Sequence, residues 1–192
     1  MSSLPTQAPV KVPTASPSVA PKPVVMPATQ DATIRGGGFR DTRFGLEPFI
    51  ANVGDANRFA LVEFDASGLL PGVEYSFSLR FYVSFVGADE SRVVTVNRLD
   101  SAVEWNEATV TWSSFGDPDL VEVGWFTIFD TDEDTQVEIA LGSLPTLDDG
   151  KITLVVSIPE KASGPEKFDF RSVNFEGDES SFPTLTATPI LS

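Results

Sequence analysis

The stretch Tyr75-Ser76-Phe77-Ser78-Leu79-Arg80-Phe81-Tyr82-Val83-Ser84-Phe85 carries a large apolar side chain at every second position. Serines, one arginine and one tyrosine stand between these positions. Because side chains on a strand alternate between its two faces, this pattern predicts a long strand with one buried aromatic face and one mostly polar face. Burial of each large apolar side chain contributes about 1.5–3 kcal/mol, so this strand can anchor a hydrophobic core.

Shorter segments of the same kind occupy the rest of the chain from residue 31. Alternating or β-rich runs occur at 31–35, 46–53, 58–65, 93–99, 109–112, 125–129, 136–141, 151–158, 168–174 and 184–188. Turn signals such as Pro71-Gly72 and Asp148-Asp149-Gly150 separate them, and no window keeps a period of about 3.6 residues. The pattern predicts an all-β antiparallel β-sandwich, with a jelly roll as the expected connection pattern and an immunoglobulin-like sandwich as the alternative.

The first thirty residues have a different composition. They contain no aromatic and no acidic residue, and proline recurs every fourth position at Pro5, Pro9, Pro13, Pro17 and Pro21. Such a segment cannot bury enough apolar surface to offset its chain entropy, and proline at this density favours an extended spacer. We therefore expect residues 1–30 to be a disordered Pro-rich linker, open to O-glycosylation if the protein is secreted, or else a tail without a role. Residues 31–192 form one domain.

Charge and composition exclude several function classes. The formal net charge is −15, and all 28 acidic residues lie in residues 31–192. This field repels nucleic acid and anionic membranes, so we expect neither as a partner. The absence of Cys and His removes disulfides, Ser–His–Asp triads and imidazole metal ligands. No segment predicts a membrane span, and the N-terminal residues lack signal-peptide features, so an export signal would have to lie outside this sequence.

Four stretches spread over nearly all of residues 31–190 carry recognisable motifs: residues 31–37 with 41–45, residues 57–65, the run Trp105-Asn106-Glu107-Ala108-Thr109-Val110-Thr111-Trp112, and residues 170–172 with 182–185. In this order they resemble the DNRLRE family, which is grouped as carbohydrate-binding module family 96. Phe44, Arg43 and Phe59 depart from the residues usual in that family, which has Tyr, Asn and often an acidic residue at these positions.

The resemblance implies a jelly-roll module that occurs beside polysaccharide lyases and other surface domains and binds acidic polysaccharides such as alginate. We therefore expect a non-catalytic polysaccharide-binding module, secreted or on the cell surface, with further domains attached. Two alternatives remain open. One is a structural or adhesive sandwich without a sugar pocket, and the other is a polysaccharide-cleaving enzyme, which would need convergent carboxyl groups in a groove.

Arginine and aromatic side chains are the candidate ligand contacts. A planar guanidinium matches the carboxylate of a uronate, and a flat ring packs on the apolar side of a sugar. Arg35, Arg40 and Arg43 cluster near the start of the domain, and Arg58, Arg98 and Arg171 join them if their strands are neighbours. Arg80 and Tyr82 lie on the polar face of the long strand. The alternative for each arginine is an ion pair on a solvated surface. Trp105 and Trp112 are expected in or beside the core.

No cofactor is predicted with certainty, but calcium is considered at two places. The run Asp130-Thr131-Asp132-Glu133-Asp134 resembles the start of a calcium loop, yet Thr135 and Leu141 stand where an EF-hand requires Gly and Glu. We interpret it as an acidic surface turn. Resemblance to related sandwich modules implies one structural calcium between the first and last strands, with oxygen ligands from Asp31 or Asp41 together with Asp178 or Glu179.

Overall fold

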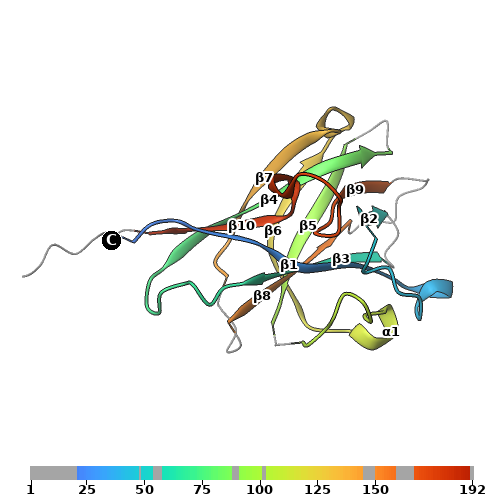
Figure 1. The fold of residues 1–192 in the computed structure, drawn as a ribbon, viewed down its shortest axis with the longest axis horizontal. Helices are drawn as coiled ribbons and strands as arrows, with labels where there is room; N and C mark the ends of the chain where they lie inside the picture. Colours follow the sequence, from blue (N-terminus) through green and yellow to red (C-terminus); the bar gives the residue numbers. More distant parts are fainter. Residues whose placement is uncertain are drawn as a thin grey trace, which may run out of the picture.

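A computed structural model describes residues 21–47, 49–53, 58–87, 91–100, 103–144, 150–158 and 167–190 (Figure 1). These residues contain ten strands and a single short α-helix, α1 (Trp112–Phe115). The strands are β1 (Val24–Arg35), β2 (Phe49–Val53), β3 (Arg58–Asp65), β4 (Tyr75–Val86), β5 (Arg92–Leu99), β6 (Leu120–Ile128), β7 (Thr135–Leu141), β8 (Lys151–Ser157), β9 (Lys167–Arg171) and β10 (Thr184–Pro189). Three short 3-10 turns, η1 (Gly37–Phe39), η2 (Asp130–Asp132) and η3 (Glu179–Ser181), complete the described elements.

Two antiparallel sheets stack on one another. Sheet A contains β4 with β7 on one side and with β10 and β9 on the other, followed by the start of β1 beside β10 and by β2 beside β9. Sheet B runs from the second part of β1 through β3, β8 and β5 to β6. The chain alternates between the sheets from β2 to β5 and again from β6 to β9. This confirms the predicted antiparallel sandwich and favours the jelly roll over the immunoglobulin-like alternative.

Strand β1 belongs to both sheets. Val24 to Pro27 pair with β10, and after a register shift between Ala28 and Gln30 the strand pairs with β3. The predicted linker boundary at residue 30 is therefore wrong for residues 24–30, which lie in the strand. Proline density suggested a spacer, but Met26 is buried and β10 supplies hydrogen bonds that the local composition does not reveal. Residues 1–20 lie outside the described part of the chain.

The core between the sheets forms around β4, as its alternation predicts. Tyr75, Phe77, Leu79, Phe81 and Val83 are all buried. The Phe81 ring lies 4.7 Å, centroid to centroid, from Phe170 in sheet A and 5.4 Å from Phe126 in sheet B. Each such aromatic pair contributes about 0.5–1.5 kcal/mol beyond its burial, so Phe81 helps to hold both sheets in register.

A second apolar cluster lies on the outer face of sheet B, beneath residues 103–119, which we call the covering segment. Ile34, Leu61 and Val155 of the sheet pack there against Val110 and Phe115. The centre of β3 is consequently buried on both faces, which explains its nearly continuous apolar sequence.

The covering segment corrects one predicted strand. Residues 109–112 lead into α1 and form no strand, because Thr111 is the N-cap of the helix. Its side-chain oxygen accepts a hydrogen bond from Ser114 N at 3.1 Å, and Ser114 Oγ accepts one from Thr111 N at 2.9 Å. This reciprocal capping box satisfies backbone donors at the helix start. Trp112 stacks on Phe59 at 5.0 Å between centroids, beside the second cluster as expected.

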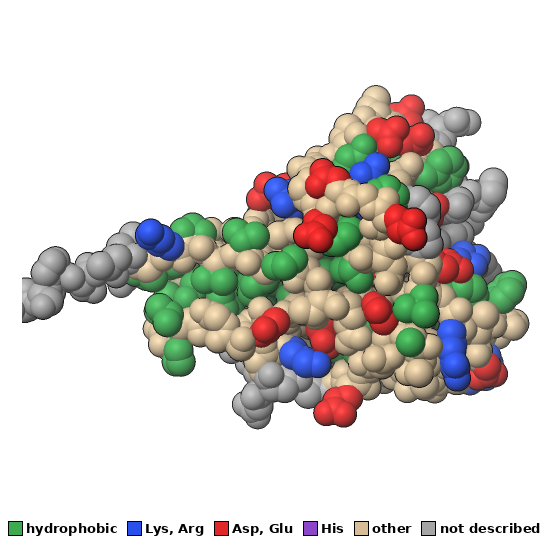
Figure 2. Space-filling view, viewed as in Figure 1, with side chains coloured by type: hydrophobic (Ala, Val, Ile, Leu, Met, Phe, Trp, Pro, Cys, Tyr) green, Lys and Arg blue, Asp and Glu red, His purple; other side chains and the backbone are tan. Residues whose placement is uncertain are grey.

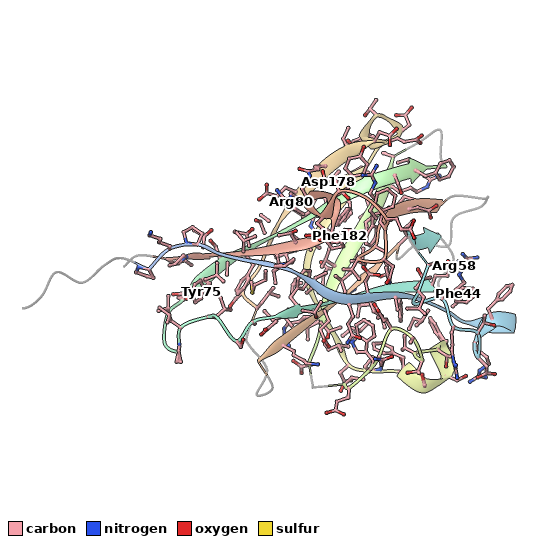
Figure 3. The ribbon with its side chains drawn as sticks, viewed as in Figure 1. Phe44, Arg58, Tyr75, Arg80, Asp178 and Phe182 are labelled. Atoms are coloured by element: carbon pink, nitrogen blue, oxygen red, sulfur yellow. The ribbon has the colours of Figure 1, made fainter. Side chains whose placement is uncertain are left out.

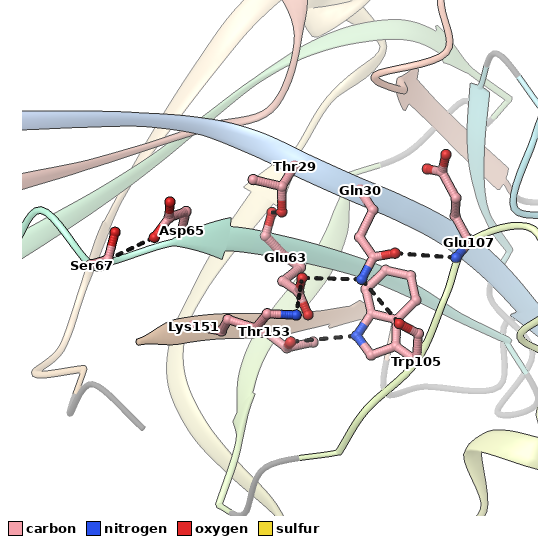
Figure 4. Close-up of polar contacts among 9 residues, drawn as sticks. All are labelled: Thr29, Gln30, Glu63, Asp65, Ser67, Trp105, Glu107, Lys151 and Thr153. Atoms are coloured by element: carbon pink, nitrogen blue, oxygen red, sulfur yellow. Dashed lines mark hydrogen bonds and ion pairs between the residues drawn. The ribbon is translucent and has the colours of Figure 1, made fainter. Parts of the chain in front are cut away.

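A polar network fastens the covering segment to sheet B (Figure 4). Gln30 Nε2 donates to Glu63 Oε1 and to the Trp105 carbonyl, both at 3.1 Å, and Glu107 N donates to Gln30 Oε1 at 3.2 Å. Lys151 Nζ lies 3.1 Å from the same oxygen of Glu63. Because Glu63 is only 5% exposed, the ammonium and amide partners offset the cost of burying its charge.

Candidate functional site

The outer face of sheet A gathers three of the predicted ligand residues. Arg80 and Tyr82 point outward from β4, and Arg171 at the end of β9 lies beside Tyr82. The guanidinium carbon of Arg171 is 3.7 Å from the centroid of the Tyr82 ring and 4.3 Å from that of Phe175. Two aromatic rings therefore contact one guanidinium, each by a cation–π interaction. We call Arg80, Tyr82, Arg171 and Phe175 the sheet A site.

Stacking leaves only the edge of the Arg171 guanidinium for hydrogen bonding. Arg171 Nε is buried and has no hydrogen-bond partner among the described residues. Asp178 carries the opposite charge, and Arg171 acts on it electrostatically. Hydrogen bonds from Ser180 lower the pKa of the Asp178 carboxyl, and the charge of Arg171 lowers it further. An edge that carries several aligned N–H groups matches a carboxylate or a pair of hydroxyls.

Arg80 stands opposite Glu138 of β7 and Thr184 of β10 in the strand register. Within the described part of the chain, no carboxylate lies within ion-pairing distance of its guanidinium. Figure 3 labels Arg80 and Asp178 close together, above β10. Hydroxyl side chains continue this face beyond Arg80, from Ser76, Ser78, Thr186 and Thr188. The face therefore combines positive charge, aromatic surface and hydroxyl groups.

Arg35 and Arg58 lie together elsewhere, opposite each other in the pairing of β1 with β3. The Arg35 guanidinium lies 4.0 Å from the Phe44 ring centroid and 3.7 Å from Glu47 Oε2. Figure 3 shows Arg58 and Phe44 at a different part of the molecule from Arg80. The structure therefore does not bring this pair to the sheet A site.

The remaining predicted arginines are Arg40, Arg43 and Arg98. Arg40 Nε donates to Ser113 Oγ at 2.9 Å, which ties η1 to α1, and Arg40 lines a hollow of about 410 Å³ with Trp112. Arg98 pairs with Asp100 at 2.8 Å, and Arg43 is exposed. Figure 2 shows acidic and basic side chains interspersed over the face in view. Ion pairing, the alternative considered for each arginine, holds for Arg35 and Arg98.

The predicted calcium ligands do not form a cluster. No group of three or more metal-ligating side chains occurs within the described residues. Asp31 is buried, and its Oδ2 accepts from Val173 N at 2.7 Å. Asp41 and Glu179 are exposed, and both Asp178 oxygens bond within their own turn. Calcium binding stays a prediction that a solution measurement must test.

Asp31 has the most perturbed carboxyl group of the described residues. Burial raises its pKa to about 7, since the hydrogen bonds from Val173 and Ser172 compensate only in part, and the charge of Glu107 raises it slightly. Asp31 Oδ1 and Glu107 Oε2 are both buried without a hydrogen-bond partner in the described structure. The Asp31 carboxyl is therefore partly protonated near neutral pH, where an ordinary aspartate is fully ionised.

Phe175 is the site residue that the sequence analysis missed. It lies after the end of β9, where no strand alternation indicates the direction of a side chain. Its contact with Arg171 depends on the turn in which Phe175 N donates to the Ser172 carbonyl at 3.1 Å.

The sequence matches carbohydrate-binding module family 96 over residues 22–139. This match covers more than half of the 192 residues. The chain therefore belongs to carbohydrate-binding module family 96, in agreement with the resemblance of its motifs. The family is in general non-catalytic and typically extracellular. No helix among the described residues is long and apolar enough to cross a membrane.

Other comparisons give weaker likenesses. No curated protein matches the sequence. One similar solved structure contains the CBM22-1 and GH10 modules of the N-terminal part of Clostridium thermocellum endo-1,4-β-D-xylanase 10B, complexed with xylohexaose. It is 13% identical with a TM-score of 0.36, and the alignment covers 89% of this chain and 29% of that chain. The chain thus spans less than a third of that solved chain.

Proposed function

We propose that this module binds an acidic polysaccharide, of the uronate type found in alginate, on the outer face of sheet A. Membership in a carbohydrate-binding family supplies the class of ligand. The observation that carries the choice of face is the guanidinium of Arg171, which lies against two aromatic rings. A guanidinium oriented in this way loses little side-chain entropy when it donates hydrogen bonds to a carboxylate, because stacking has already ordered it.

Arg80 and the hydroxyl groups extend the proposed contact along β4 and β10. Arg80 supplies a second cation without an ion-pair partner among the described residues, whereas Ser78 and Thr186 offer hydroxyls two residues further along both strands. Neighbouring sugars of an extended chain would meet these groups in turn. Glu138, Asp178 and the net charge of −15 repel a polyanion, and salt screens this repulsion as well as the attraction by the arginines. We therefore expect added salt to lower the affinity less than it lowers the affinity of a uniformly basic surface.

The biological role follows from the same proposal. We propose that the module is secreted or displayed on the cell surface, does not itself catalyse a reaction, and keeps an attached domain near its polysaccharide. Tethering raises the effective concentration of the attached domain at its substrate without any new contact.

Affinity electrophoresis of the whole chain in gels containing alginate, polygalacturonate, xylan or mannan tests the proposal. We expect retardation by the two uronates, a loss of about tenfold in affinity for Arg171→Ala, and partial loss for Arg171→Lys, which keeps the charge without the planar fork. Arg98→Ala is the matched control, because Arg98 is already paired with Asp100. Equal retardation of Arg171→Ala and the natural protein would show that the binding site lies elsewhere on the molecule. Absence of retardation by every glycan would favour the structural or adhesive alternative.

A further inference from the structure

Trp125 is the most exposed aromatic side chain of the described residues that lies within a strand. It lies on the outer face of sheet B and is 62% exposed, whereas its neighbours Phe126 and Ile128 point into the core. No aromatic ring packs against Trp125 among the described residues. Tryptophan is usually well buried, so an indole left bare at the middle of a strand requires an explanation.

The residues around Trp125 are fixed by the pairing of β5 with β6. Thr95 stands directly opposite Trp125, and Val93 stands opposite Thr127 on the same face. Val93 is 47% exposed, and Asn97 continues this face along β5. We call Val93, Thr95, Asn97, Trp125 and Thr127 the Trp125 strip.

The Trp125 strip ends where the covering segment begins. Leu99 and Leu120 pair further along the same two strands and belong to the second apolar cluster, beneath residues 103–119. One half of the outer face of sheet B is thus covered and the other half exposes the indole. Gln30 of β1 fastens the covering segment to sheet B at Trp105 and Glu107.

Two side chains of the Trp125 strip offer donor and acceptor groups that can bind the hydroxyls of a neutral sugar. The Asn97 amide and the Thr127 hydroxyl have no hydrogen-bond partner among the described residues, whereas the Thr95 hydroxyl is bonded to Ser157 at 3.1 Å. The amide can both donate and accept, as can the hydroxyl. Among the registered pairs from Val93–Thr127 to Asn97–Glu122, Glu122 is the only charged residue. Its negative charge disfavours a uronate and leaves a neutral ring as the complementary partner.

We propose that the Trp125 strip is a second polysaccharide-binding surface, which stacks a neutral sugar ring on the indole and bonds its hydroxyls through Asn97 and Thr127. The surface lies on the opposite side of the sandwich from the sheet A site and uses none of its residues. Its ligand class differs as well, since no arginine faces Trp125 in the registered pairs. One module can therefore contact two polysaccharide chains of different charge.

Titration of the whole chain with xylohexaose, cellohexaose and mannohexaose tests this inference, with the indole N–H signals followed by NMR. The signal absent from Trp125→Phe assigns Trp125. We expect at least one hexaose to shift that signal, and Trp125→Ala to lose about tenfold or more in affinity for it, with Trp125→Phe retaining part. Phe129→Ala, which removes another exposed ring, is the matched control and should bind as the natural protein does.

The outcomes separate this surface from the sheet A site. Arg171→Ala should leave neutral hexaose binding unchanged, and Trp125→Ala should leave alginate binding unchanged. Unaltered hexaose affinity in Trp125→Ala, or no shift of the Trp125 signal with any of the three, would overturn the second surface. Concentration-dependent sedimentation that Trp125→Ala abolishes would also overturn it, because a second copy of the chain would then cover the strip.

Discussion

The guanidinium carbon of Arg171 lies 3.7 Å from the centre of the Tyr82 ring, although the two residues come from strands far apart in the sequence. This contact makes Tyr82 a positioning residue for Arg171 as well as a surface that a sugar can meet. The Tyr82 hydroxyl adds only a long contact of 3.5 Å to Asp134 Oδ1. The ring, more than the hydroxyl, is expected to matter for binding.

Tyr82→Leu should therefore weaken uronate binding, whereas Tyr82→Phe should not. Loss of the Tyr82 ring removes a cation–π interaction of about 0.5–2 kcal/mol, which predicts a loss of roughly twofold to thirtyfold in affinity. Affinity electrophoresis on alginate measures the difference, with the unfolding midpoint as a check on folding. The interpretation of Tyr82 as a positioning residue fails if Tyr82→Leu and the natural protein are retarded equally.

Stability should depend on pH through Asp31. Its pKa is raised from 3.8 to about 7, so the folded state binds more protons than the unfolded state between these values. The stabilisation is full below about pH 4 and is lost as pH rises through about 7, with a maximum of about 4 kcal/mol. Asp31→Asn keeps an acceptor for Val173 N and should lose this pH dependence, so the difference between the two unfolding curves isolates the effect.

Calcium and a chelator should be added in separate runs of the same experiment. A calcium-induced rise in the unfolding midpoint of the natural protein that is absent in Asp31→Asn would support the structural calcium predicted from the resemblance. A difference curve that is flat from pH 4 to 8 in chelator would contradict a carboxyl group with a raised pKa at Asp31.

Phe81→Ala should destabilise the fold by about 3–5 kcal/mol, because it opens a cavity where rings from both sheets meet. Chemical denaturation measures the free energy of unfolding. Phe129→Ala removes the same ring from a position that is 47% exposed, and it should change stability by less than about 1 kcal/mol. Similar losses in both variants would mean that the core does not centre on β4.

Gly45→Ala tests how closely the loop after η1 approaches residues 103–119. A Cβ atom at Gly45 would overlap the carbonyl oxygen of Glu107 and lie 2.5 Å from its carbon, so the backbone must shift. We expect a loss of at least about 2 kcal/mol in stability. Gly38→Ala is the matched control, because a Cβ atom there meets nothing within 4 Å. Equal midpoints for the two variants would show that the loop can move away at little cost.

Local periodicity made a large part of this structure predictable. The alternation from Tyr75 to Phe85 identified the buried face of β4 and placed Arg80 and Tyr82 on its outer face. The same rule, applied to Trp125, Phe126 and Ile128, gives the exposed indole, although the sequence analysis did not single it out. These predictions succeed because the direction of a side chain on a strand depends only on the parity of its position.

The tertiary structure alone decided which of those side chains meet. Arg171 and Phe175 join Tyr82 only because β9 pairs with the end of β4, whereas Arg35 and Arg58 meet through the pairing of β1 with β3. The extension of β1 to Val24 and the burial of Asp31 likewise depend on distant partners. Strand pairing and burial join residues far apart in the chain, so the sequence by itself determined the two faces of the strands, and long-range packing determined the sites.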